Sequence, residues 1–120
     1  MNYEIVSVNL SNKTLIEEFL RNAGNSLKKF RYFHSRPIEV IKNHSATLIV
    51  LKGKKVVGYG HLDKENNKIW LGTAVIEDEK GKGIGKMIMD KLFEEARMKK
   101  INKITLTVDN DNSSAISLYG

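Results

Sequence analysis

The sequence predicts a single α/β domain, residues 1–120, with a mixed central sheet flanked by helices. Three observations lead to this fold class. Apolar, β-branched runs separated by short polar turns follow Ser45, which is typical of an antiparallel meander. Between positions 84 and 96 an apolar residue recurs every fourth position, the spacing of an amphipathic helix. The segment KITLTVD then alternates with period two, so the order strand, turn, helix, strand predicts a neighbouring parallel pair.

The first 44 residues predict one strand followed by helices. Residues 3–8 alternate as a strand does, and Ser11 and Asn12 offer caps for a helix that continues through Leu20. Residues 25–33 predict a second helical piece, and Pro37 fits the first turn of another short one.

The remaining elements follow in order. The runs ATLIVLK, VVGYGHLD and IWLGTAVI are the three strands of the meander, with KGKK and ENNK as turns. In the last segment, NDNSSAISLYG, Asn112 or Ser113 caps one or two helical turns.

Composition narrows the function classes. The chain has no cysteine, and its three histidines lack a shared ligand spacing, so we expect no metal site. No leader or membrane-spanning run is present, which favours a cytoplasmic protein. The net charge of +6 fits nucleic acid, a phosphorylated cofactor or an acidic surface. Because the lysines are spread along the chain, nucleic acid is the less favoured partner.

The stretch EKGKGIGK, residues 79–86, lies between the third meander strand and the long helix. A glycine-rich turn there exposes backbone N–H groups beside the positive end of the helix dipole, where phosphate oxygens bind, and some of its positions are expected to need positive φ. The alternative is an ordinary flexible turn. Neither the P-loop nor the dinucleotide fingerprint fits its spacing. The residues expected around the phosphate are Lys80, Gly81, Lys82, Gly83, Ile84, Gly85 and Lys86.

The run AVIEDEKGKGIGKMIMDKLFEEA resembles the acetyl-CoA-binding motif of the GNAT superfamily of N-acetyltransferases. The family's pattern of Arg or Gln, two residues, Gly, one residue, Gly or Ala falls on Lys80, Gly83 and Gly85. Lys80 departs from the usual Arg or Gln, keeping the charge without the planar fork of donors.

A second segment, DNDNSSAISLYG, resembles the family's Asn-x-x-Ala-x-x-Leu-Tyr motif at Asn112, Ala115, Leu118 and Tyr119. The family continues past that tyrosine into further strands, whereas this sequence stops at Gly120. The resemblance therefore implies a GNAT-like fold short of its C-terminal strands. Three explanations are open: the sheet is incomplete, a second copy completes it in a homodimer, or the sequence is a fragment.

The resemblance also implies a mechanism, in which acetyl-CoA enters between two splayed strands and an amine attacks its thioester directly. The open strand edge would be residues 73–76, with backbone groups of Val75 and Ile76 pairing with the pantetheine arm. Asn112 would hydrogen-bond the same arm.

Tyr119 matches the family's general acid, with packing on the sheet as its alternative role. His61 titrates in the range of a base for the amine, and Glu77 lies just past the strand edge. For both, a bystander role is the alternative. The segment FRYFHSRP lies where the resemblance implies the acceptor site, and Tyr32, His34 and Arg36 are its expected residues. The alternative for this segment is helix packing with solvated arginines.

The resulting hypothesis is an N-acetyltransferase that uses acetyl-CoA to modify a primary amine of a small molecule. Two alternatives stay open at this stage, a non-catalytic acyl-CoA-binding or regulatory module and a basic nucleic-acid-binding domain.

Overall fold

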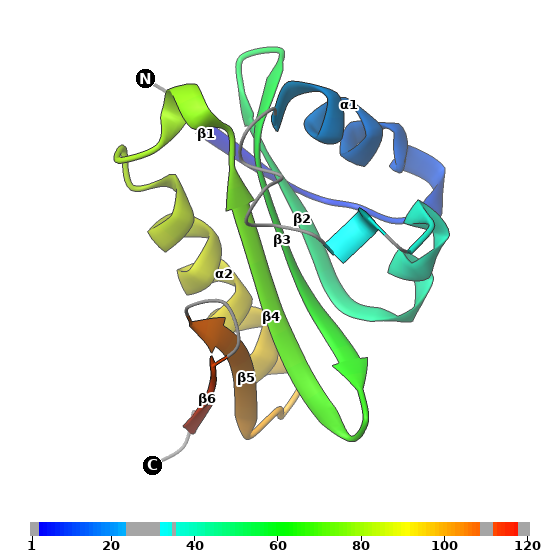
Figure 1. Ribbon diagram of the computed structural model, residues 1–120, viewed down its shortest axis with the longest axis vertical. Helices are drawn as coiled ribbons and strands as arrows, with labels where there is room; N and C mark the ends of the chain where they lie inside the picture. The colour runs from blue at the N-terminus through cyan, green and yellow to red at the C-terminus, as the bar shows by residue number, and fades with distance from the viewer. Residues whose placement is uncertain (1–2, 24–31, 35, 109–111, 118–120) are drawn as a thin grey trace.

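The computed structural model describes residues 3–23, 32–34, 36–108 and 112–117. Its six strands form one sheet in the order β1-β2-β3-β4-β5-β6 (Figure 1). All neighbouring pairs are antiparallel except β4 and β5, which are parallel. The strands are β1 (Tyr3–Ser7), β2 (His44–Lys52), β3 (Lys55–Glu65), β4 (Lys68–Val75), β5 (Lys103–Val108) and β6 (Asn112–Ser117). The predicted fold class, a mixed sheet with an antiparallel meander and a parallel pair, is confirmed.

The helical elements also follow the predicted order. They are η1 (Leu10–Asn12), α1 (Thr14–Ala23), η3 (Tyr32–His34), η4 (Ile38–Asn43), η5 (Glu77–Glu79) and α2 (Ile84–Met98). At η1 the side chains of Asn9 and Asn12 form a capping box: Asn9 accepts a hydrogen bond from the Ser11 amide, and Asn12 accepts one from the Asn9 amide. The helix for which Ser11 or Asn12 was the predicted cap is α1, which begins only at Thr14, after Lys13. Pro37 stands just before η4. The helix predicted over residues 25–33 falls mostly outside the described residues.

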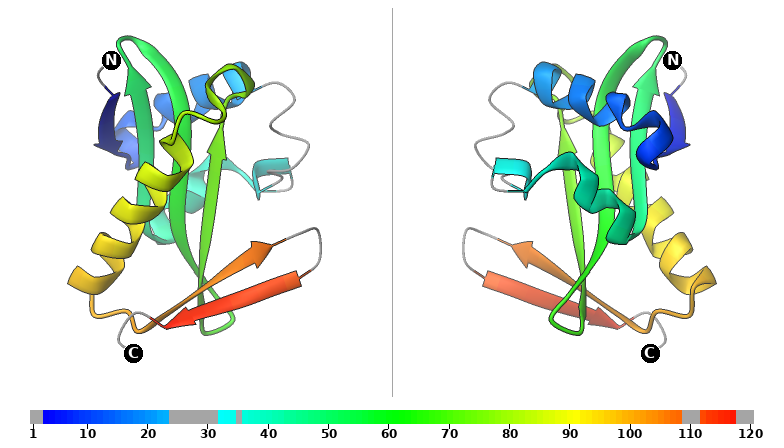
Figure 2. Two further views of the ribbon diagram at one scale, coloured as in Figure 1. Left: turned by 90° about the vertical axis from the view of Figure 1, so that its left-hand side faces the viewer. Right: turned by 90° about the vertical axis from the view of Figure 1, so that its right-hand side faces the viewer.

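The two long helices cover opposite faces of the sheet (Figures 1 and 2). Residues on β3 alternate between these faces, as in any strand. Tyr59 stacks on Phe19 of α1, with ring centroids 5.9 Å apart. Gly58 and Gly60 face α2, since a Cβ at either glycine would meet Ile88 within 3.1 Å. The absence of side chains at these glycines lets α2 pack close to the sheet.

The C-terminal segment differs from the prediction. Residues Asn112–Ser117 form a strand and not the predicted helix, and they pair with β5 from Val108↔Asn112 to Lys103↔Ser117. The outer edge of β5 would otherwise leave its N–H and C=O groups without partners, and β6 satisfies them. Here long-range strand pairing outweighs the local capping preference of Asn and Ser. The predicted homodimer stays a prediction.

Candidate functional site

Strands β4 and β5 run side by side over only part of their length. β4 pairs with β3 from Lys68 to Val75. Its register with β5 consists of Trp70↔Thr105 and Leu71↔Leu106. In Figure 2, β5 turns away from β4 beyond this short ladder. The strand edge expected at residues 73–76 therefore lies where the two parallel strands diverge.

The backbone of β4 presents its polar groups alternately to its two neighbours. The Ile76 N–H donates to the Val57 carbonyl at 3.0 Å, and the Ile76 carbonyl accepts from the Glu79 amide at 3.0 Å. Alternate residues of an antiparallel pair direct these groups to the same side, so Thr73 and Val75 direct theirs toward β5. The Ile76 backbone thus already has partners in β3 and η5, and its predicted contact with a cofactor stays a prediction.

The glycine-rich turn continues directly from this edge into α2. Gly81 has φ of 80° and Gly83 has φ of 85°, so the predicted positive φ is confirmed at these two positions. A Cβ at either would meet nothing within 4 Å, which means that backbone conformation and not crowding requires glycine.

Gly83 is the N-cap of α2, and its carbonyl accepts the first helical hydrogen bond, from Met87. It has no side chain to cap the helix. The amides of Ile84, Gly85 and Lys86 precede that first bond, so they have no intrahelical acceptor and face outward at the positive end of the helix dipole. This arrangement can bind an anion.

Each lysine of the turn lies beside a carboxylate. The ion pairs are Lys80–Glu77 at 3.0 Å, Lys82–Glu79 at 3.4 Å and Lys86–Asp90 at 2.8 Å. Glu77 of η5 is exposed and paired with Lys80, and its predicted role as a base stays a prediction.

His61 lies on the α1 side of the sheet, directly over β4. A Cβ at Gly72 would be 2.5 Å from His61 Nε2, so the imidazole occupies the space that glycine leaves. Gly72 follows Leu71, the last β4 residue in register with β5. The predicted base therefore stands where the strands diverge. Its Nδ1 lies 2.6 Å from the Tyr59 hydroxyl, and burial, with help from His44 and Arg36, lowers the pKa of His61 well below its usual range.

A chain of hydrogen bonds, which we call the Asp63 network, packs against His61. The Tyr32 hydroxyl lies 2.6 Å from Asp63 Oδ2 and 2.7 Å from His44 Nε2, and His44 Nδ1 lies 2.9 Å from Thr47 Oγ1. An ionised carboxylate only accepts, so Tyr32 donates its one hydroxyl hydrogen to Asp63. Burial lowers the pKa of His44, and the neutral ring then donates from Nε2 to Tyr32 and accepts from Thr47.

Three members of the Asp63 network were not predicted from the sequence: His44, Thr47 and Asp63. The sequence does carry a signal for Asp63: in HLD, residues 61–63, His61 and Asp63 fall on the same face of a buried strand. In the structure, His44 is directly opposite Asp63 in the β2–β3 register. Polar residues at inward positions of a strand require partners.

The predicted acceptor residues are only partly described. Tyr32 belongs to the Asp63 network, and burial raises its pKa with help from the hydrogen bond to Asp63. The Arg36 guanidinium lies 4.4 Å from the centre of the Tyr32 ring. The side chains of His34 and Asn112 and all of Tyr119 lie outside the described residues, so their predicted roles stay predictions.

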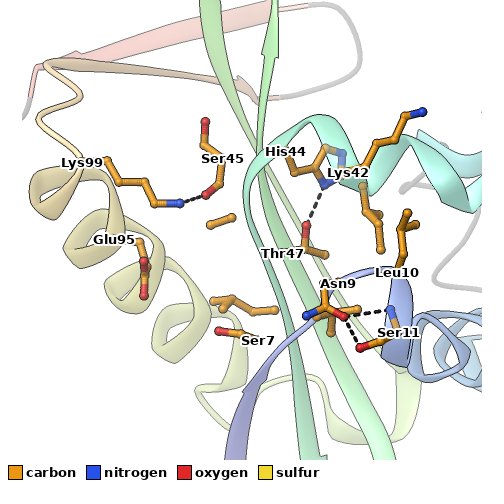
Figure 3. Close-up of a pocket in the computed structure, with 14 residues that line it drawn as sticks. Ser7, Asn9, Leu10, Ser11, Lys42, His44, Ser45, Thr47, Glu95 and Lys99 are labelled. Atoms are coloured by element: carbon orange, nitrogen blue, oxygen red, sulfur yellow. Dashed lines mark hydrogen bonds between the residues drawn. The ribbon is translucent and has the colours of Figure 1, made fainter.

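A groove of about 620 Å³ lies at the opposite edge of the sheet, where β1 ends and β2 begins (Figure 3). Ser7, Asn9, Lys42, His44 and Lys99 are among the residues that line it. It contains none of the residues of the glycine-rich turn. His44 and Thr47 belong both to this groove and to the Asp63 network, so one end of the network borders the groove.

In the described part of the chain, no helix is long and apolar enough to cross a membrane. Within the same residues, no three His, Asp or Glu side chains gather as ligands for a metal ion.

Comparisons with known proteins place this geometry in a family. Residues 12–120 match the model of the acetyltransferase (GNAT) family. A segment of 73 residues is 32% identical to the uncharacterised protein YxbD of Bacillus subtilis (strain 168), and it covers 52% of this chain and 46% of that protein. The match thus spans about half the length of this curated relative.

Two solved structures illustrate the likeness in fold. A GNAT family acetyltransferase from Brucella melitensis, in complex with acetyl-CoA, superposes with a TM-score of 0.74 at 14% identity over 99% of this chain and 89% of that one. The PaiA N-acetyltransferase from Thermoplasma acidophilum, in complex with coenzyme A, has a TM-score of 0.69 at 17% identity over 93% and 82%. Since the family model covers nearly the whole sequence, the chain belongs to the GNAT acetyltransferase family.

Proposed function

We propose that this protein transfers an acetyl group from acetyl-CoA to a primary amine of a small molecule. The observation that carries the proposal is the divergence of β4 from β5 immediately before a glycine turn that opens a helix. Family membership supports acetyl transfer in general, and the Brucella and Thermoplasma proteins were crystallised with acetyl-CoA and coenzyme A.

In this proposal the turn holds the pyrophosphate of CoA. The outward amides of Ile84, Gly85 and Lys86 donate to phosphate oxygens, and the backbone at Gly81 and Gly83 curves around them. Lys80, Lys82 and Lys86 supply positive charge. These residues fit the pyrophosphate group, because the site combines backbone donors that have no intrahelical acceptor, a helix N-terminus and three lysines.

The pantetheine arm would extend along β4, pairing with backbone groups of Thr73 and Val75 on the side facing β5. Asn112 is proposed to hydrogen-bond the same arm. It does so as the first residue of strand β6 and not, as the sequence predicted, as a helix cap. Such a path would bring the thioester to Gly72, the position over which the His61 imidazole lies.

On the acceptor side, an alkylammonium with a pKa of about 10.4 must lose a proton before it can attack. His61 is the proposed proton acceptor, because its ring is neutral near pH 7 and stands where β4 and β5 diverge. The bound thioester supplies the acyl group for direct attack, and Tyr119 is the proposed proton donor to the departing thiolate.

The first test is calorimetry of acetyl-CoA binding to the wild type and to Gly83→Asp. We expect Gly83→Asp to abolish binding, because it adds bulk and negative charge at the turn. Gly53→Asp is the matched control, since Gly53 also has a positive φ, of 63°, but lies in the β2–β3 turn. Failure of the wild type to bind acetyl-CoA would reject the proposal, and equal affinity of Gly83→Asp would reject the role of the turn.

If acetyl-CoA binds, a panel of primary amines with detection of free thiol tests transfer. Tyr119→Phe is expected to lower kcat while leaving the affinity for acetyl-CoA unchanged. Binding without turnover on any amine would favour the non-catalytic acyl-CoA-binding module instead.

A further inference from the structure

Glu79 is the exception among the charged residues of η5 and the glycine-rich turn. Its side chain is only 7% exposed, whereas those of Glu77, Lys80 and Lys82 are 58%, 42% and 44% exposed. It ends η5, directly before the extended residue Lys80 and the two glycines with positive φ. A carboxylate in this position must find partners or lose stability.

Three donors from three parts of the chain converge on this carboxylate. The Tyr3 hydroxyl of β1 donates at 3.2 Å, Lys52 of β2 lies at 3.3 Å, and Lys82 of the turn lies at 3.4 Å. Tyr3 and Lys52 are direct partners in the β1–β2 register, so their side chains leave the same face of the sheet together. Glu79 thus attaches the turn to the far edge of the sheet, three strands away from the β4–β5 divergence.

The surroundings keep the carboxylate ionised. Burial alone raises the pKa of Glu79, but the hydrogen bonds from Lys52, Tyr3 and Lys82 outweigh that effect and lower it. Charge-assisted hydrogen bonds of this kind are the stronger class in proteins. With the carboxylate fixed at one end and Gly83 continuing into α2 at the other, the intervening backbone has few alternative conformations.

We propose that Glu79 is a positioning residue for the anion site, holding the turn on β1 and β2 so that its amides already point at the phosphate position before ligand binds. The inference deepens the proposed function and, as far as it concerns CoA, rests on it. Glu79 carries a charge that repels phosphate, and the geometry indicates that its effect on backbone order outweighs that repulsion. Preorganised donors bind more tightly because less conformational freedom is lost on binding.

The neighbouring Asp78 provides a matched control. It is exposed and directly precedes Glu79 in η5, so Asp78→Asn removes the same charge without touching the attachment to the sheet. We expect Glu79→Gln to weaken CoA binding about tenfold, roughly what one hydrogen bond to a charged group is worth. Asp78→Asn should leave the affinity unchanged or slightly increase it. Calorimetry well below the unfolding temperature of each variant separates this effect from a loss of stability.

A second measurement does not need CoA at all. In ¹⁵N-labelled protein, the amide resonances of Gly81, Gly83 and Gly85 report the order of the turn. Glu79→Gln should broaden or shift all three while leaving Gly58 and Gly60 of β3 in place. If Glu79→Gln does not fold, Tyr3→Phe and Lys52→Met each remove one donor and should produce a smaller change in the same resonances.

The outcomes are distinguishable. A wild type that does not bind CoA rejects the proposed function, while the glycine resonances still decide whether Glu79 orders the turn. A wild type that binds CoA, with Glu79→Gln equal to it in affinity and in the three resonances, overturns the positioning role. Weakening by the same factor in Asp78→Asn would overturn it as well, because charge alone would then explain the effect.

Discussion

Replacement of Gly60 by alanine should destabilise the protein by forcing α2 away from the sheet. A Cβ at Gly60 would lie 2.3 Å from Ile88 Cγ2 and 3.1 Å from Leu92 Cδ1. Ordinary contacts between carbon atoms are about 3.5–4.0 Å, so the first is more than 1 Å too short. Both neighbours are fully buried, which leaves them little room to move.

Overpacking of this kind costs about 1–3 kcal/mol. We expect Gly60→Ala to lie in the middle of that range, and a loss of about 2 kcal/mol lowers the midpoint temperature by roughly 8 °C in a domain of this size. Urea unfolding followed by circular dichroism measures the change in free energy. Because α2 begins at the glycine-rich turn, CoA affinity should fall in the same variant.

Two further variants check the cause. At Gly58 the shortest contacts of a new Cβ would be 3.1 Å, to Ile84 and Ile88, so Gly58→Ala should cost less than Gly60→Ala. Ile88→Leu removes the Cγ2 that causes the clash at Gly60, and the double variant should recover part of the lost stability. A Gly60→Ala protein within 0.5 kcal/mol of wild type, or no recovery in the double variant, would refute the reasoning; the 0.5 kcal/mol threshold is about the usual size of surface effects.

Other predictions concern the acceptor side. Tyr32→Phe removes the donor to buried Asp63 and should cost about 1–3 kcal/mol of unfolding free energy, measurable in urea; no loss would contradict the network. The folded-state pKa values of His44 and His61 are lowered, so near and below the ordinary histidine pKa of about 6.5 the unfolded state binds more protons than the folded state. Stability should therefore fall as the pH drops from 7 to 5. Denaturation midpoints that increase as the pH is lowered would contradict the burial of neutral rings. Gly72→Ala should displace the His61 imidazole and reduce acetyl transfer while sparing CoA binding; unchanged turnover on an identified acceptor would remove His61 from the mechanism.

Much of the fold could be predicted because its signals are local. The β2–β3–β4 meander and α2 each bury one face, and their periodicities of two and of 3.6 residues appear directly in the sequence. The positive φ at Gly81 and Gly83 follows similarly from residue type. The strand β6 could not be predicted in this way, because its partner is the free edge of β5 and the local residues favour a helix cap.

The site was predictable in its backbone and less so in its side chains. The glycine turn and its position before α2 were accessible from motif and strand order, while the roles of Val75 and His61 stay predictions. The engagement of Ile76 with β3 depends on hydrogen-bond phase along the strand, which a sequence does not specify. The meeting of His44 with Asp63 depends on register across a strand pair that contains an irregularity between His44 and Ala46.

The two-residue ladder between β4 and β5 has a consequence for the order in which the native state opens. Four strands of the sheet are joined by long ladders, while β5 and β6 form a hairpin that reaches them through Trp70 and Leu71. A segment held by few cross-strand hydrogen bonds opens at a lower free energy than the global transition. Backbone amides of β5 should therefore exchange with deuterium well before those of β2 and β3. The β5–β6 hairpin should open as one cooperative unit, separating from β4 at the place where the substrates are proposed to meet.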